Sequence, residues 1–228
     1  TNMYKFWTVD VLRFVTIFFT ISVFVSMFFY PGGNIHDPSQ IGYSISHNFL
    51  SDLGGYTSHS GLPNLISFLI FNFSMILFTL IGISFLFIPT LFKEDIISFI
   101  ISVIGSAFLF FGTLFFAGVG LTPYDLYLDE HIFFAINAFR LLVPGLVLYF
   151  FVLIRSSVSK KYSVMIFCLL FFTFLYVVYQ IISDSPLTSI EQMVEQAIIQ
   201  KIITIVNIIC MFFLSFAFSE RLKDIKLN

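Results

Sequence analysis

Six long apolar runs, joined by short connections, constrain this chain more than any other feature. Each run is long enough for the ~20 helical residues that cross a hydrocarbon core of ~30 Å. The chain is 58% hydrophobic and only 11% charged, whereas charged residues make up roughly one-quarter of a soluble domain. We therefore expect an all-α integral membrane bundle of six transmembrane helices, in one domain covering residues 1–228. The predicted spans are 7–30, 62–89, 96–119, 131–154, 162–182 and 197–218.

The basic residues of the connections predict which way the bundle faces. Lys or Arg precedes the first run, separates the second from the third, and follows the fourth and the sixth. The connections 31–61, 120–130 and 183–196 contain neither residue. By the positive-inside rule both termini are predicted to be cytoplasmic, and these three connections face outward from a multi-pass protein of the cell membrane. A net charge of −2 gives no reason to expect nucleic acid as a partner.

The first outer connection carries a helical pattern of its own. Ile41, Ile45, Phe49 and Leu53 recur every four residues, opposite a polar side, and Gly54-Gly55 follows. This spacing predicts a short interfacial helix with its apolar face toward lipid or bundle.

Arg140 is the charge that a membrane span accommodates least easily. It lies ten residues into the fourth run, about 15 Å below the outer surface at 1.5 Å per residue. An Arg at this depth costs at least ~2.5–3.5 kcal/mol unless it faces a polar interior. Asn137 shares its face, and Asn72 and Asn207 lie at matching depth in other runs. One interpretation is a set of inter-helix hydrogen bonds that fixes the bundle.

The other interpretation is an outward-facing polar pocket with a cationic floor. Such a pocket suits an anionic group, such as a lipid phosphate or carboxylate. The polar residues of the outer loops would complete it. The ligand-binding candidates are Arg140, Asn72, Asn137, Asn207, Asn48, Ser51, Asp52 and Asp125.

Histidines and carboxylates in the outer loops raise the possibility of a metal site. His47, His131, Asp52 and Asp125 could bind Zn²⁺ or another divalent ion. Their spacings match no short metal motif, and residues of these types in loops commonly cap helices or face solvent. A divalent metal is thus the one cofactor the sequence suggests, and a chain without any cofactor is the alternative.

Three segments resemble a family of six-span bacterial and archaeal membrane proteins. They are the stretch from His47 to Gly54, the region around Asn72, and Gly120-x-Thr-Pro-x-Asp125 followed by His131-x-x-x-Ala135. The family is that of domain of unknown function 998, which in turn resembles the eukaryotic Frag/DRAM/Sfk membrane proteins linked to lipid remodelling. The resemblance covers the first four spans, roughly 7–150. It implies a six-span fold and carries no established reaction. The positions it marks are Asn48, Ser51, Asp52, Gly54, Pro123, Asp125 and His131.

These observations leave three functional hypotheses. The favoured one is a membrane protein that binds a lipid headgroup or another anionic group in its outer pocket, with membrane lipids as partners. The second is an accessory subunit that packs against other membrane protein subunits. The third is an intramembrane enzyme, a metal-assisted lipid hydrolase or transferase, which requires Asp52, Asp125 and His131 to converge.

Overall fold

The computed structural model describes residues 2–227 and is helical through all six predicted spans. The first span comprises α1 (Asn2–Lys5), a π-helical turn η1 (Phe6–Asp10) and α2 (Val11–Phe29). The second comprises α3 (Leu65–Ile76), α4 (Phe78–Phe87) and the 3₁₀ turn η3 (Ile88–Phe92). The other four are single helices: α5 (Ile96–Leu121), α6 (Leu128–Arg155), α7 (Lys160–Ile182) and α8 (Ile190–Leu227).

Six helical stretches are long and apolar enough to cross a membrane, which confirms the predicted number of spans. The largest difference in bounds concerns the last one, Ile190–Ile225, which was predicted as 197–218. Its first turns are rich in Glu and Gln, which favour helix but lower the hydropathy. The helix therefore begins well before its apolar stretch.

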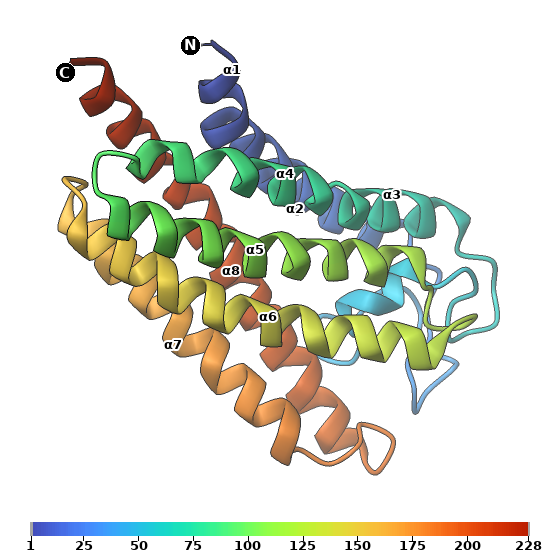
Figure 1. The fold of residues 1–228 in the computed structure, drawn as a ribbon. Coiled ribbons are helices and arrows are strands. Elements are labelled where there is room, and N and C mark those ends of the chain that lie inside the picture. The colour runs from blue at the N-terminus through green and yellow to red at the C-terminus, as the bar shows by residue number, and fades with distance from the viewer. Residues whose placement is uncertain (1, 228) are drawn as a thin grey trace.

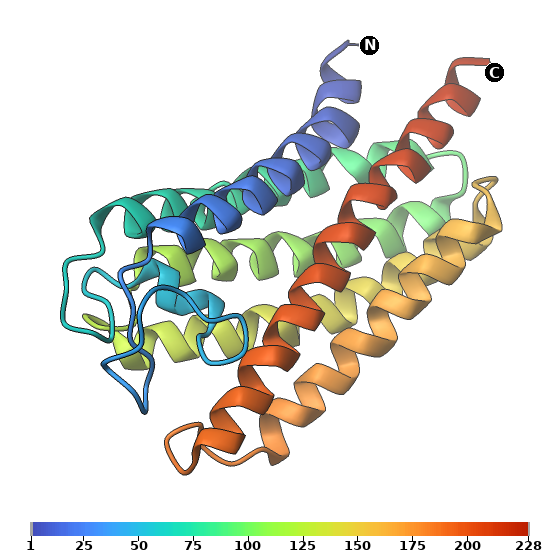
Figure 2. The ribbon, with the colours of Figure 1, turned by 180° about the vertical axis from the view of Figure 1, so that it is seen from behind.

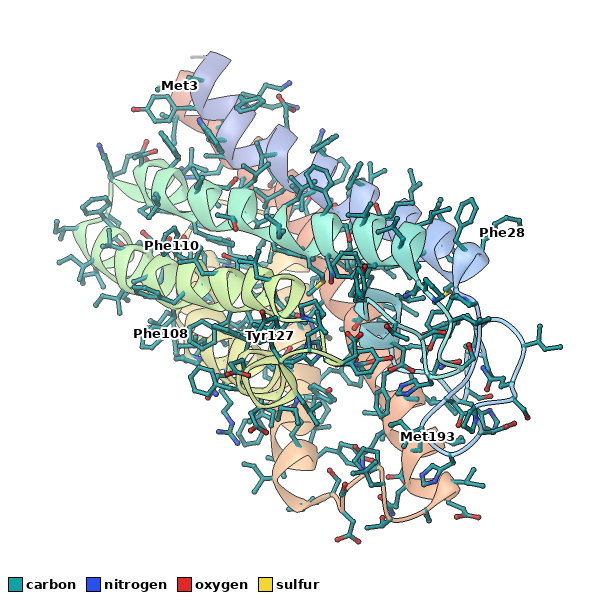
Figure 3. All side chains as sticks on the ribbon, turned by 90° about the vertical axis from the view of Figure 1, so that its right-hand side faces the viewer. Met3, Phe28, Phe108, Phe110, Tyr127 and Met193 are labelled. Carbon is teal, nitrogen blue, oxygen red and sulfur yellow. The ribbon has the colours of Figure 1, made fainter. Side chains whose placement is uncertain are left out.

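The spans form one bundle with both termini at the same end (Figures 1 and 2). We call this end the terminal end and the opposite one the loop end. Figure 3 labels Met3 and Phe28, which lie at the two ends of the first span and so mark the terminal end and the loop end. An even number of spans requires the two termini to share a side; that this side is cytoplasmic remains a prediction.

Small residues allow α5 and α6 to lie side by side along their length (Figure 1). Gly105 and Gly112 of α5 meet Tyr149 and Leu142 of α6, and a Cβ on Gly145 would lie 2.7 Å from the side chain of Leu109. Close backbone approach at small residues is a main source of helix association in membranes.

At the terminal end, polar contacts fasten α8 to the rest of the bundle. The buried Arg221 donates from Nε to the Leu91 carbonyl (2.9 Å) and pairs through Nη2 with Glu94 (2.6 Å). Arg13 of α2 donates from Nε to Ser215 Oγ (2.9 Å) and lies over the Phe216 ring. From this crossing α2 and α8 diverge toward the loop end (Figures 2 and 3).

The first outer connection contains a shorter helix than its pattern predicts. Only η2 (Leu50–Gly54), a single 3₁₀ turn, is helical beyond isolated turns, and Ile41 and Ile45 are exposed. Hydrogen bonds from side chains, described below, hold residues 31–49 in an irregular path instead. Leu50 and Leu53 face the bundle, while the position of η2 at a membrane interface remains a prediction.

Gly145→Val tests the α5–α6 contact. The added side chain would collide with Leu109, and we expect a loss of about 1–3 kcal/mol in the free energy of unfolding, as in other overpacked cores. Ala107→Val adds methyl groups at an exposed position of α5 and is the matched control. Reversible unfolding in mixed micelles measures both; equal stability of the two variants would contradict a tight seam.

Candidate functional site

A cavity extends from the loop end toward the middle of the bundle. Its empty volume is about 890 Å³, which includes space open to the outside. The space in which a water-sized molecule can be centred is about 110 Å³. This is below the ~300–1,000 Å³ typical of small-molecule sites, so a larger ligand would have to extend through the open side of the cavity. Helices α2 to α6, α8 and the turn η2 all contribute to its wall. Most of the wall is apolar and aromatic, including Phe19, Phe71, Met75, Phe116 and Phe139.

Polar side chains interrupt this wall on several sides. Gln200, Thr204 and Asn207 share one face of α8, since residues four and seven apart lie above one another on a helix. Ser51 projects from η2 and Thr113 from α5. The cavity wall therefore combines a large apolar surface with a few hydrogen-bonding groups.

His131 lines the cavity from the first turn of α6. Its Nδ1 lies 2.6 Å from the carbonyl oxygen of Thr122, which can only accept, so Nδ1 carries the proton. In the neutral ring Nε2 is then an acceptor. Besides Thr122, the Val119 carbonyl is a backbone hydrogen-bond partner of this ring.

The turn η2 forms a roof over the cavity through Leu50 and Ser51. On its other side the buried Asp52 accepts from Asn48 Nδ2 (2.9 Å) and from the Phe49 amide (3.0 Å), and His59 Nε2 lies 3.3 Å away. Asn48, fully buried, also donates to the Gly33 carbonyl (2.8 Å). The side chains of Asp52 and Asn48 thus make hydrogen bonds that take the place of the backbone hydrogen bonds of a longer helix.

Both α3 and α8 hold this roof in place. On the α3 side, Asn72 Nδ2 donates to the Gly54 carbonyl (2.8 Å) and Ser67 to the Leu53 carbonyl (2.9 Å). A Cβ on Gly54 would lie 2.5 Å from Asn72 Oδ1, so this close approach requires glycine. On the α8 side, Gln200 Oε1 accepts from the Leu50 amide (2.8 Å).

Lys201 makes the second contact between α8 and the roof. The side chain is buried, and its Nζ donates to the carbonyls of Asn48 and Ala197. It also lies 5.6 Å from the centre of the Tyr43 ring. Lys201 was not among the predicted site residues, although its position as a lone basic residue near the outer side was a usable signal.

Three phenols surround the roof carboxylate. Burial, and then the negative charge of Asp52, raise the pKa of Tyr30, Tyr43 and Tyr124 well above that of free tyrosine. All three are therefore uncharged hydrogen-bond donors across the physiological range. Tyr124 also stacks on His59, with ring centres 5.0 Å apart.

The structure brings several predicted site residues together and separates others. Ser51, His131 and Asn207 line the cavity, and Asn48, Asp52 and Asn72 build its roof. Asp125 is exposed and accepts from the amides of Tyr56 and Thr57, which fixes a surface loop. Asn137 donates to the Phe133 carbonyl of its own helix, and His47 Nδ1 lies 2.8 Å from the Ser46 hydroxyl.

Arg140 does not line this cavity, so the structure gives no support to the predicted cationic floor. The side chain is exposed on the outside of α6 and does not contribute to the cavity wall. The reason is helical geometry, because Leu142 faces the cavity and two residues along a helix correspond to a rotation of about 200°. The depth of Arg140 in its span could be predicted from the sequence, but the side of the helix on which it lies could not.

The four metal-ligand candidates do not gather. Within the described part of the chain, no group of three or more His, Cys, Asp or Glu side chains could hold a metal ion. Asp52 and Asp125 already accept from backbone amides, and His131 uses one ring nitrogen on Thr122. Metal binding stays a prediction without a preformed site.

No protein-family model, curated protein or solved structure matches this chain.

Lys201→Met tests how the roof is held. Removing the amine leaves the buried Asn48 carbonyl without this donor, and a bond to a charged group contributes roughly 1.5–3 kcal/mol. We expect amide hydrogen exchange in residues 44–54 to accelerate about 10- to 100-fold, at tenfold per ~1.4 kcal/mol. Lys223→Met, at an exposed position of the same helix, is the control. Unchanged exchange in both would show that Lys201 does not hold the roof.

Proposed function

We propose that this polytopic membrane protein binds a membrane amphiphile in the cavity between its helices. The apolar chain lies among the aromatic walls, and the head lies beneath the η2 roof near Ser51, His131 and Gln200. The observation that carries the proposal is the cavity itself, whose wall is mostly apolar with a few hydrogen-bonding groups.

The charge of the lining modifies the hypothesis drawn from the sequence. Among residues 2–227, the wall of the cavity includes no Lys or Arg. Lys201 already donates to the carbonyls of Asn48 and Ala197, and Arg140 lies outside the cavity on the exposed side of α6. An anionic headgroup would therefore be buried without a counter-charge, which is costly in a low-dielectric site. An uncharged head fits this wall better.

The divergence of α2 and α8 suggests how a lipid enters. A hydrogen bond from Arg13 to Ser215 joins the two helices near the terminal end, and the distance between them increases toward the loop end (Figure 2). Phe19 of α2 and Ile208 and Met211 of α8 line the cavity on this side. We expect an acyl or isoprenoid chain to pass between them from the outer leaflet, without the roof having to open.

Ala135→Trp tests the proposal by filling the cavity. Ala135 lies in the wall, so the indole would occupy the space of the bound chain. We expect at least a tenfold drop in the lipid retained by the purified protein, measured by mass spectrometry after extensive detergent exchange. Ala107→Trp places the same side chain at an exposed position of α5. A second blocking variant, Ile208→Trp, covers the case in which the first one does not fold, and equal retention in folded blocked and control variants would contradict the proposal.

A second candidate function, subunit of a larger membrane complex, is favoured by Arg140. An exposed guanidinium within a span costs at least ~2.5–3.5 kcal/mol in lipid, and no residue within 2–227 makes a salt bridge or hydrogen bond with it. A carboxylate on a neighbouring protein helix would remove this cost. Such a contact would make α6 an interface.

Arg140→Leu separates this candidate from the first. If the chain is a subunit, wild-type protein extracted gently from its native membrane will have the mass of a defined complex, and the variant that of a single chain. Phe151→Leu changes an exposed residue about three turns away on the same face of α6 and leaves the guanidinium intact. Single-chain mass for the wild type would remove this candidate. Lipid retention is expected to be unchanged in both variants.

A further inference from the structure

We infer that the head of the bound amphiphile is an uncharged hydroxyl group, so that the ligand is a lipid alcohol. This inference rests on the proposed function and identifies the chemical class of its ligand. It follows from the hydrogen bonds that the polar wall residues already make, because these determine which donors and acceptors are left for a ligand.

Three of the six polar wall residues can only accept. Thr204 donates its hydroxyl proton to the Gln200 carbonyl (2.7 Å), and Thr113 donates to the Phe110 carbonyl (2.8 Å). A hydroxyl has a single proton, so each leaves only lone pairs. His131 Nε2 is likewise an acceptor, because Nδ1 carries the proton toward Thr122. A ligand without a donor would leave these groups unpaired.

The remaining groups supply donors. Gln200 uses Oε1 to accept from the Leu50 amide, and this bond fixes the orientation of the carboxamide and leaves its NH₂ group for a ligand. Asn207 donates to the Ile203 carbonyl and retains Oδ1 and one N–H. The Ser51 hydroxyl can act in either sense. The wall therefore offers both acceptors and donors.

A hydroxyl group is the simplest head that meets this combination. Its proton can go to an acceptor such as His131 Nε2, while its lone pairs accept from a donor such as Gln200 Nε2. A carboxylate or phosphate only accepts, and beneath the roof it would face the lone pair of His131 Nε2 without a cation in the wall. An ether or ester only accepts as well and donates to none of the three acceptors, whereas a hydroxyl donates its one proton to one of them. A wall that needs a hydrogen-bond donor from its ligand thus distinguishes lipids that have the same chain but different heads.

A series of probes with one chain and different heads tests the inference. The purified full-length chain in nanodiscs is loaded with radiolabelled 1-hexadecanol, hexadecyl methyl ether, hexadecanoate, hexadecyl phosphate or hexadecane. Retention is measured after washing. We expect hexadecanol to be retained at least tenfold better than any other probe. His131→Phe should lower its retention about 3- to 10-fold, as expected for one hydrogen bond, whereas Thr204→Val leaves that bond intact and should not lower it.

Thr20→Val is the matched control, since Thr20 makes the same bond to its own helix (2.8 Å) at an exposed position. Equal retention of all five probes, abolished by Ala135→Trp, would overturn the alcohol while leaving the lipid-binding function intact. Preferential retention of hexadecanoate or the phosphate would also overturn it. Retention of no probe, or retention insensitive to both blocking variants, would overturn the proposed function as well.

Discussion

A buried polar connection between the first outer loop and α8 holds the loop end of this bundle together. Lys201 donates to the main chain at Asn48, Asn48 donates to Asp52, and Asp52 caps the turn that roofs the cavity. Each of these side chains is buried, so each bond lost would leave a polar atom with fewer partners in a low-dielectric region. The irregular loop can therefore lie against the bundle in one defined position without a regular helix of its own.

Helix α8 is in close contact with its neighbours at the terminal end and is farther from α2 at the loop end, where the cavity lies. At the terminal end Arg221 and Arg13 draw α8 against the turn η3 and against α2. At the loop end α2 and α8 lie farther apart. The space between them is covered by the roof and is not filled by side chains. Glycines hold α5 and α6 closely together, and both helices contribute to the cavity wall.

The sequence predicted the spans well and the site only in part, for a physical reason. Membrane spans follow from length and hydropathy, which are local properties, and all six were found. The roof residues Asn48 and Asp52 were selected because they lie on the polar side of the pattern in the first outer connection and in the segment that resembles the six-span family. The side on which Arg140 lies depends on how α6 packs, and the pairing of Lys201 with Asn48 joins residues 153 positions apart. Neither is encoded in a local pattern.

A protein that binds lipid within a membrane cannot gain selectivity from the hydrophobic effect. The tail of the ligand leaves one apolar environment for another, so its transfer contributes little, and packing and hydrogen bonds remain. The uncharged groups of the wall suit this condition, because each can discriminate between heads without the desolvation cost of a buried charge. A guanidinium in the same wall would bind anions abundant in any membrane. Arg140 is exposed and not part of the cavity wall, as the proposed recognition of an uncharged hydroxyl head requires.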